Sequence, residues 1–181
     1  VFDVLSYPNL YHNLKAGIKE IVTSDSHVQA FYPDDRYGRE NMLRILEAKD
    51  YRELPEHMRG AAEEAYETMA KTGDGQLCDV IADAACLTAM AEAGRKSKSN
   101  LLREYLESTV AVTDIKIAVR GLRTGKNLNF MKKALAPCDL LDVRSLAAAA
   151  SESEEKLLGY LETHGFREAA DALRESPSAF E

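Results

Sequence analysis

The sequence lacks tryptophan, is poor in aromatic residues, and contains only five prolines in 181 positions. Proline and glycine interrupt helices, whereas aromatic and β-branched residues are typical of strands. The aliphatic residues are mainly alanine and leucine, both strong helix formers. This composition favours an all-α fold, in a chain long enough for one domain or two small ones with a buried core.

Long apolar runs and an excess of positive charge are also missing. No run approaches the ~20 apolar residues that a membrane-spanning helix requires. Acidic residues outnumber basic ones by 30 to 23, which gives a net charge of −7. Because nucleic-acid phosphates require clustered lysine and arginine, this balance argues against a nucleic-acid partner. The sequence therefore predicts neither a direct membrane span nor nucleic-acid binding.

Paired cysteines are absent as well. The three cysteines are an odd number and include no C-x-x-C motif. Cys78 and Cys86 fall on one predicted helix, about 12 Å apart along its axis, which is too far for a disulfide. Together with Cys138, they are expected to be reduced packing residues of a cytosolic protein.

No complete catalytic, cofactor-binding or metal-binding motif is present. The nearest candidate is the pair Asp79 and Asp83, which lie one turn apart on a helix face and resemble half of a divalent-metal site. No second acidic pair stands opposite in an obvious way, and this spacing is common on solvated or helix-pairing faces. We therefore expect a protein that is not an enzyme and has no metal, cofactor or catalytic residue.

Apolar residues at helical spacing divide the chain into successive helices. The predicted helices cover residues 9–23, 42–49, 55–73, 74–94, 99–122, 127–135, 142–150, 151–165 and 166–174. Ser151 and Glu154 have the spacing of a capping box at the start of the eighth of these. Residues 25–38 lack periodicity and predict a loop.

The longest predicted helix, 99–122, contains a β-branched run at 109–113 that also suits a strand. Its helical flanks favour a helix, because propensity differences amount to only tenths of a kcal/mol per residue. The side chains predicted to face the core are Leu102, Tyr105, Leu106, Thr109, Val112 and Val119.

Two blocks of the sequence resemble each other. Residues 11–21 align with 112–122 at an offset of 101, and residues 41–44 align with 129–132 at an offset of 88. The second offset is smaller because the loop after the first helix is longer in the first copy than in the second. This order predicts a duplicated helical unit, with a first unit at 1–98, incomplete at its start, and a second at 99–181, incomplete at its end. The alternative is that any two amphipathic helices align passably.

Three segments carry a resemblance to a known family: YHNLKAGIKEI, YRELPEHMRGAAEEAYETMAKTGDGQLCDVIADAACL and LLREYLESTVAVTDIKIAVRGLRTGK. In this order they resemble the C subunit of prokaryotic, archaeal-type V-type ATPases, which is related to the d subunit of the eukaryotic vacuolar enzyme. The resemblance extends over roughly residues 4–173. Its motifs are structural and loosely defined, so that its specificity lies in their order.

The resemblance also singles out polar positions on the two matching helices. In the first copy the family pattern falls on Asn13, Lys15 and Lys19. In the second copy it falls on Asp114, Lys116 and Arg120, although the family has asparagine at the position of Asp114 and aspartate at that of Ala111. These six matched residues are candidate polar contacts to partner subunits.

The resemblance implies a funnel-shaped, non-catalytic coupling subunit in the central stalk of a rotary V-type ATPase or ATP synthase. Such a subunit sits on the membrane proteolipid ring, holds the foot of the central shaft and couples ATP turnover to ion or proton transport. Its implied location is cytoplasmic and peripheral to the membrane. The family's chains are longer at both ends, and this sequence starts without methionine, so we expect an internal fragment.

A generic all-α helical-repeat module that binds proteins is the alternative. Solenoid repeats of this kind have periods of about 33 to 47 residues. The predicted unit of about 90 to 100 residues is much longer, which favours the coupling subunit.

Overall fold

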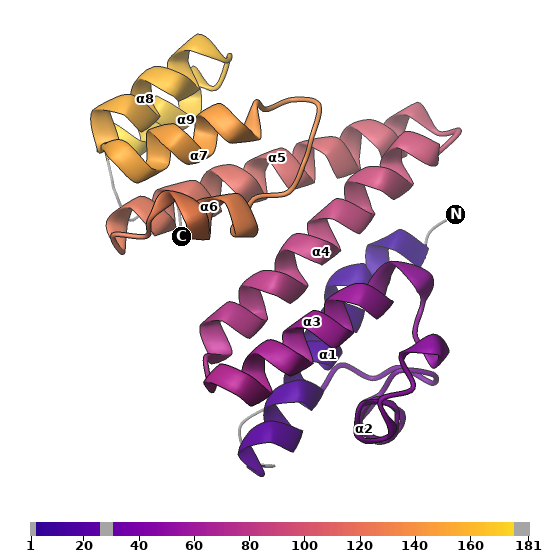
Figure 1. The fold of residues 1–181 in the computed structure, drawn as a ribbon. Helices are drawn as coiled ribbons and strands as arrows, with labels where there is room; N and C mark the ends of the chain where they lie inside the picture. The colour runs from indigo at the N-terminus through magenta and orange to yellow at the C-terminus, as the bar shows by residue number, and fades with distance from the viewer. Residues whose placement is uncertain (1–2, 26–30, 176–181) are drawn as a thin grey trace. The chain divides into compact units, whose positions relative to one another are not determined.

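The computed structural model describes residues 3–25 and 31–175. Over these residues the protein is all-α, with helices and no strand, as the sequence predicts (Figure 1). None of the described helices is both long and apolar enough to cross a membrane. The chain divides into two compact units, Val1–Met90 and Ala91–Glu181, and the division falls inside helix α4 (Gly75–Lys96). The duplication into units 1–98 and 99–181 stays a prediction.

The first unit is built around one central helix. It consists of the 3₁₀ helix η1 (Asp3–Ser6), α1 (Tyr7–Thr23), α2 (Arg39–Ala48), the 3₁₀ helix η2 (Tyr51–Glu53), α3 (Glu56–Thr72) and the first part of α4. Helix α1 packs against both α2 and α3. Most of the buried residues of α1 are apolar, but the polar side chains of Asn13 and Glu20 are buried as well.

The contact between α1 and α2 is close because it is centred on a glycine. A Cβ atom on Gly17 would lie 2.8 Å from Cδ1 of Leu46 and 3.1 Å from Cγ of Met42. Leu46 and Met42 are fully buried against this position. The absence of a side chain on Gly17 therefore allows α2 to approach α1 more closely than a larger residue would permit.

The turn between α3 and α4 follows directly from two local sequence signals. Gly73 ends α3 with φ of 67°, and its N–H donates to the carbonyl of Met69. Glycine adopts this left-handed conformation without steric cost. Oδ1 of Asp74 then accepts a hydrogen bond from the backbone N–H of Leu77 at 2.9 Å, as expected for a residue capping the start of α4.

The second unit is a stack of helices. After the end of α4 it contains α5 (Asn100–Arg123), α6 (Leu128–Ala134), α7 (Val143–Glu152), α8 (Glu154–Thr163) and α9 (Arg167–Glu175). Helix α5 packs against α6 and α7, α7 packs against α8, and α8 packs against α9 (Figure 1). The core of the unit lies between these layers, where Leu106, Leu146 and Leu157 are fully buried.

Side-chain caps set the starts of the helices in this unit. Ser99, Asn127 and Asp142 each accept hydrogen bonds from the first turns of α5, α6 and α7. The predicted capping box at Ser151 is wrong, because the cap of α8 is Ser153, whose hydroxyl accepts from the N–H of Lys156. Ser151 still belongs to α7 and donates to the carbonyl of Ala148 instead.

Helix α5 is continuous through the β-branched run at 109–113, which confirms the helical prediction. The predicted buried face is only partly correct. Leu106 and Val119 are buried, but the side chains of Tyr105 and Val112 are 55% and 49% exposed. The core side of α5 is instead lined by residues one position away, such as Val110 and Ala111. Apolar residues therefore occupy more than one face of α5, and periodicity alone does not identify the buried one.

Candidate functional site

Asn13 ties a loop of the first unit to α1. Its side chain is fully buried, and Nδ2 donates to the carbonyls of Tyr32 and Tyr37 at 3.0 Å each. Its Oδ1 accepts from the backbone N–H of Tyr32 at 2.8 Å. Three polar groups of the segment that leads into α2 are thus satisfied by one amide. Asn13 is a structural residue in this unit.

Lys15 and Lys19 are also used within the first unit. Nζ of Lys15 lies 2.6 Å from Oδ1 of Asp83. Nζ of Lys19 lies 2.6 Å from Oδ1 and 2.8 Å from Oδ2 of Asp79. The spacing of one turn on α1 matches the spacing of one turn on α4, so that the two ion pairs form side by side. The aspartates considered as half of a metal site are therefore the counter-ions of these lysines.

These ion pairs should make a small contribution to stability. The side chains of Lys15 and Asp83 are 20% and 50% exposed, so water screens much of their attraction. We expect a double-mutant cycle with Lys15→Met and Asp83→Asn, measured by urea unfolding, to give a coupling energy of about 0.5–1 kcal/mol. The exposed Lys71–Glu67 pair of α3 is a matched control, and no excess coupling over that pair would contradict the prediction.

Asp114 holds a loop of the second unit to α5, much as Asn13 holds a loop of the first unit to α1. Its carboxylate is fully buried, and Oδ1 accepts a hydrogen bond from the backbone N–H of Ala136 at 3.0 Å. Its Oδ2 has no hydrogen-bond partner among the described residues. Burial raises the pKa of Asp114 to about 7, although the hydrogen bond from Ala136 acts in the opposite direction. The carboxyl group is therefore poised to change charge near neutral pH.

The two buried side chains make the same kind of contact. Asn13 accepts from Tyr32 and Asp114 accepts from Ala136, and each of these two backbone donors directly precedes a proline. The loop that contains Tyr32 leads into α2, which packs against α1. The loop that contains Ala136 leads into α7, which packs against α5, and α2 and α7 are both ten residues long. These contacts relate α2 to α7, whereas the sequence alignment pairs part of α2 with part of α6.

Lys116 and Arg120 have a different environment from Lys15 and Lys19. Both are exposed, and neither forms an ion pair or side-chain hydrogen bond among the described residues. They line a hollow of about 280 Å³ on α5 together with Arg123. Its remaining lining residues are Thr113, Ile117, Val119 and Thr124.

The six matched positions thus include four with structural roles and two that are open to a partner. Arg123 was not identified from the sequence, because its exposure depends on how α5 packs.

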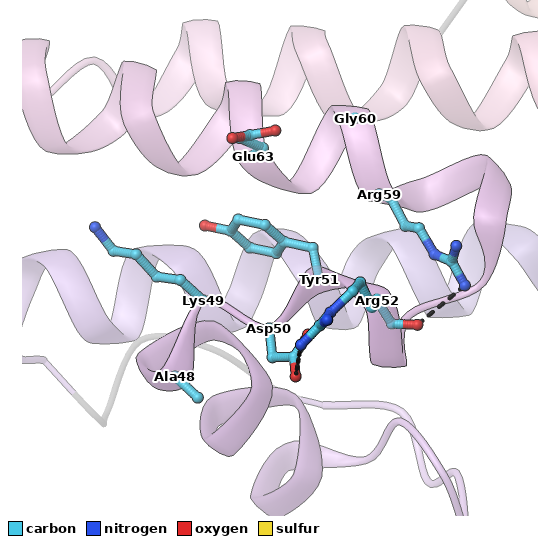
Figure 2. A pocket seen from close by; sticks show the side chains of 8 residues that line it. All are labelled: Ala48, Lys49, Asp50, Tyr51, Arg52, Arg59, Gly60 and Glu63. Carbon is cyan, nitrogen blue, oxygen red and sulfur yellow. Dashed lines mark hydrogen bonds and ion pairs between the residues drawn. The ribbon is translucent and has the colours of Figure 1, made fainter.

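A larger hollow of about 570 Å³ lies in the first unit between the end of α2, η2 and α3 (Figure 2). Two of its charged side chains pair with each other, and a third bonds to the backbone. Nε of Arg52 lies 2.8 Å from Oδ1 of Asp50, and Nη2 of Arg59 donates to the carbonyl of Arg52 at 3.0 Å. Figure 2 shows these two interactions holding the corner before α3. The hollow therefore lies over a turn that is held by these interactions, and its lining residues do not form a catalytic arrangement of acid, base and nucleophile.

The three cysteines are free and buried, as the sequence predicts. Burial raises the pKa of Cys78 and of Cys138 to about 11, and that of Cys86 to about 12. At neutral pH all three are protonated thiols, which are poor nucleophiles and poor metal ligands. Among the described residues, no group of three or more histidine, cysteine or acidic side chains is placed to hold a metal ion.

Comparison with known proteins gives one finding. The sequence matches the family described as ATP synthase (C/AC39) subunit over residues 1–181. No match was found among curated proteins or among solved structures. The family match extends over the whole sequence and agrees with the all-α fold and with the resemblance seen in the sequence motifs. The chain therefore belongs to the ATP synthase (C/AC39) subunit family, whose members are non-catalytic subunits of a rotary ATPase.

Proposed function

We propose that this protein is the coupling subunit that links the central shaft of a V-type ATPase or ATP synthase to its membrane proteolipid ring. In this role it sits on the cytoplasmic side of the membrane, peripheral to it, and transmits rotation during ion transport. The observation that carries the proposal is the family match over residues 1–181.

The helical packing is consistent with a mechanical role. A subunit that transmits torque must resist deformation, and closely packed helices resist it because a well-packed interior has few voids. The approach of α2 to Gly17 and the buried tethers at Asn13 and Asp114 connect loops and helices within each unit. Such internal contacts support stiffness within a unit.

The free cations support a polar contact with a partner. A contact between exposed cations and acidic groups of a shaft or ring subunit should weaken as salt screens the charges. Lys116 and Arg120 are exposed cations with no counter-ion among the described residues. Lys15 and Lys19, in contrast, already have counter-ions within the first unit, so we assign partner contact to the second copy of the motif.

The proposal is tested by binding of the full-length protein to purified shaft subunits and to the solubilised proteolipid ring. We expect it to bind both at low salt, and to bind the ring less as salt rises. An unrelated acidic helical protein of similar net charge serves as the control. If the protein binds neither partner at low salt, while circular dichroism shows that it is folded, the coupling function is wrong and a generic helical binding module becomes the better description.

A further inference from the structure

The exposed face of α5 combines apolar and basic side chains in a regular order. Leu101, Tyr105, Val112, Lys116 and Arg123 follow one another at spacings of four, seven, four and seven residues. At 3.6 residues per turn these spacings place all five on one side of the helix. The side extends over about 33 Å of helix axis. It is referred to below as the α5 face.

The apolar half of the α5 face is unusually exposed. Leu101 is 78% exposed, the highest value among the large exposed apolar side chains of the described residues, and Tyr105 and Val112 are about half exposed. Single exposed apolar residues are common, but here three lie on one helix side and form a strip that is interrupted only by small or polar residues such as Ser108. Such a strip gains free energy when a partner covers it.

The basic half follows along the same side, and Arg120 lies at its edge beside Lys116 and Arg123. Lys116, Arg120 and Arg123 line the hollow of about 280 Å³, and none has an ion pair among the described residues. The surrounding sequence strengthens the charge, because residues 115–138 contain six lysines and arginines and no acidic residue. In a chain with a net charge of −7, this local positive charge attracts an acidic partner and orients it.

We propose that the α5 face binds a helix of a partner protein whose own exposed side presents apolar residues followed by acidic ones. A straight strip with spacings of four and seven residues matches the ridges of another helix laid along it. The partner's acidic side chains would pair with Lys116, Arg120 and Arg123. The proposal rests on the proposed function in that the partner helix belongs to the shaft or ring subunits.

The order of the side chains favours a protein helix over a lipid surface. A helix that lies on a membrane has its cations on the polar face flanking the apolar one, so that all apolar residues reach a similar depth. On the α5 face the apolar and basic residues are separated along the axis instead. The exposed Glu104, which lies on the apolar half of α5, would also be repelled by anionic headgroups.

The test compares two triple charge reversals in the full-length protein. One variant carries Lys116→Glu, Arg120→Glu and Arg123→Glu. The control carries Arg36→Glu, Arg144→Glu and Arg167→Glu, which are exposed positions outside α5 with no side-chain partner among the described residues. Both variants change the net charge equally, so long-range effects of charge cancel. Binding to the purified shaft and ring subunits is measured across a range of salt concentrations, and circular dichroism checks folding.

We expect the α5 variant to bind at least one of these subunits more than tenfold more weakly, and with less dependence on salt, while the control stays within about twofold of the native protein. A photo-crosslinker replacing Tyr105 should label a helical segment with apolar and acidic residues in that subunit. If the native protein binds the subunits and both variants bind equally well, the α5 face is not the contact and the proposed function still stands. If the native protein binds neither subunit, both proposals fail.

Two further measurements exclude other occupants of the α5 face. The native protein and the α5 variant are mixed with vesicles of anionic phospholipid, and their self-association is measured by analytical ultracentrifugation. We expect no vesicle binding and no dimer that depends on the α5 cations. Binding of vesicles that the α5 variant loses, or a dimer that it loses, would overturn the proposal in favour of a lipid surface or of a second copy of this chain.

Discussion

Replacing Asp114 by asparagine is expected to stabilise the protein at neutral and alkaline pH and to remove part of the pH dependence of its stability. The native carboxylate is fully buried, and its Oδ2 has no hydrogen-bond partner among the described residues. Its pKa is about 7 in the folded protein, against 3.8 for an ordinary aspartate. An amide has the same shape and never carries this charge.

The direction of the effect follows from proton binding. Between about pH 4 and pH 7 the folded protein keeps a proton on Asp114 that the unfolded chain has lost, so native stability falls as pH rises through this window. A difference of about three pKa units corresponds to up to about 4 kcal/mol. Below the window both states are protonated and above it both are ionised, so the contribution of Asp114 is then constant.

The two side chains whose pKa is raised by the charge of Asp114, Cys138 and Tyr160, do not titrate in this window. Burial raises the pKa of Cys138 to about 11 and that of Tyr160 to about 12, and the charge of Asp114 adds to both shifts. The thiol and the phenol therefore stay neutral from pH 4 to pH 8. The pH dependence that the asparagine variant loses can be assigned to Asp114 itself.

The measurement is urea unfolding of the native protein and of Asp114→Asn at several pH values between about 4 and 8 and at constant ionic strength. The difference in unfolding free energy between the two should grow with pH up to about 7 and then level off. Glu104→Gln is the control, because Glu104 is an exposed acid on the same helix. A difference that does not change with pH would show that Asp114 is ionised throughout.

The opposite exchange at the matching position, Asn13→Asp, is expected to destabilise the first unit strongly. Nδ2 of Asn13 donates to the carbonyls of Tyr32 and Tyr37, and an aspartate would place a carboxylate oxygen against these two acceptors. Both carbonyls would lose their donor, and a buried negative charge would be left unpaired. We expect a loss of roughly 3–5 kcal/mol at neutral pH.

Acidification should restore part of this loss, because a protonated carboxyl can donate to one of the two carbonyls. Asn9→Asp is the matched control, since Asn9 is an exposed residue on the same helix, and it should change stability by less than about 0.5 kcal/mol. Thermal and urea unfolding followed by circular dichroism compare the two variants. Equal stability of Asn13→Asp and Asn9→Asp would mean that the tether to the loop does not contribute.

The sequence by itself determined the fold class and the order of the helices. Helix starts at Asp74, Ser99, Asn127 and Asp142 are correctly predicted, because a cap bonds to backbone groups only two or three residues away. The one misplaced cap, at Ser151, lies two residues from the true cap at Ser153. Two nearby serines offer the same local chemistry, and the end of the preceding helix decides between them.

Only the tertiary structure decided which residues are available for function. Lys15 and Lys116 occupy matching positions in the two aligned segments, yet Lys15 has an aspartate 68 residues away as its counter-ion and Lys116 has none among the described residues. Likewise, Tyr105 and Val112 follow a helical period but lie outside the core. Helical periodicity places side chains on a common face, whereas burial and ion pairing depend on which distant elements pack against that face.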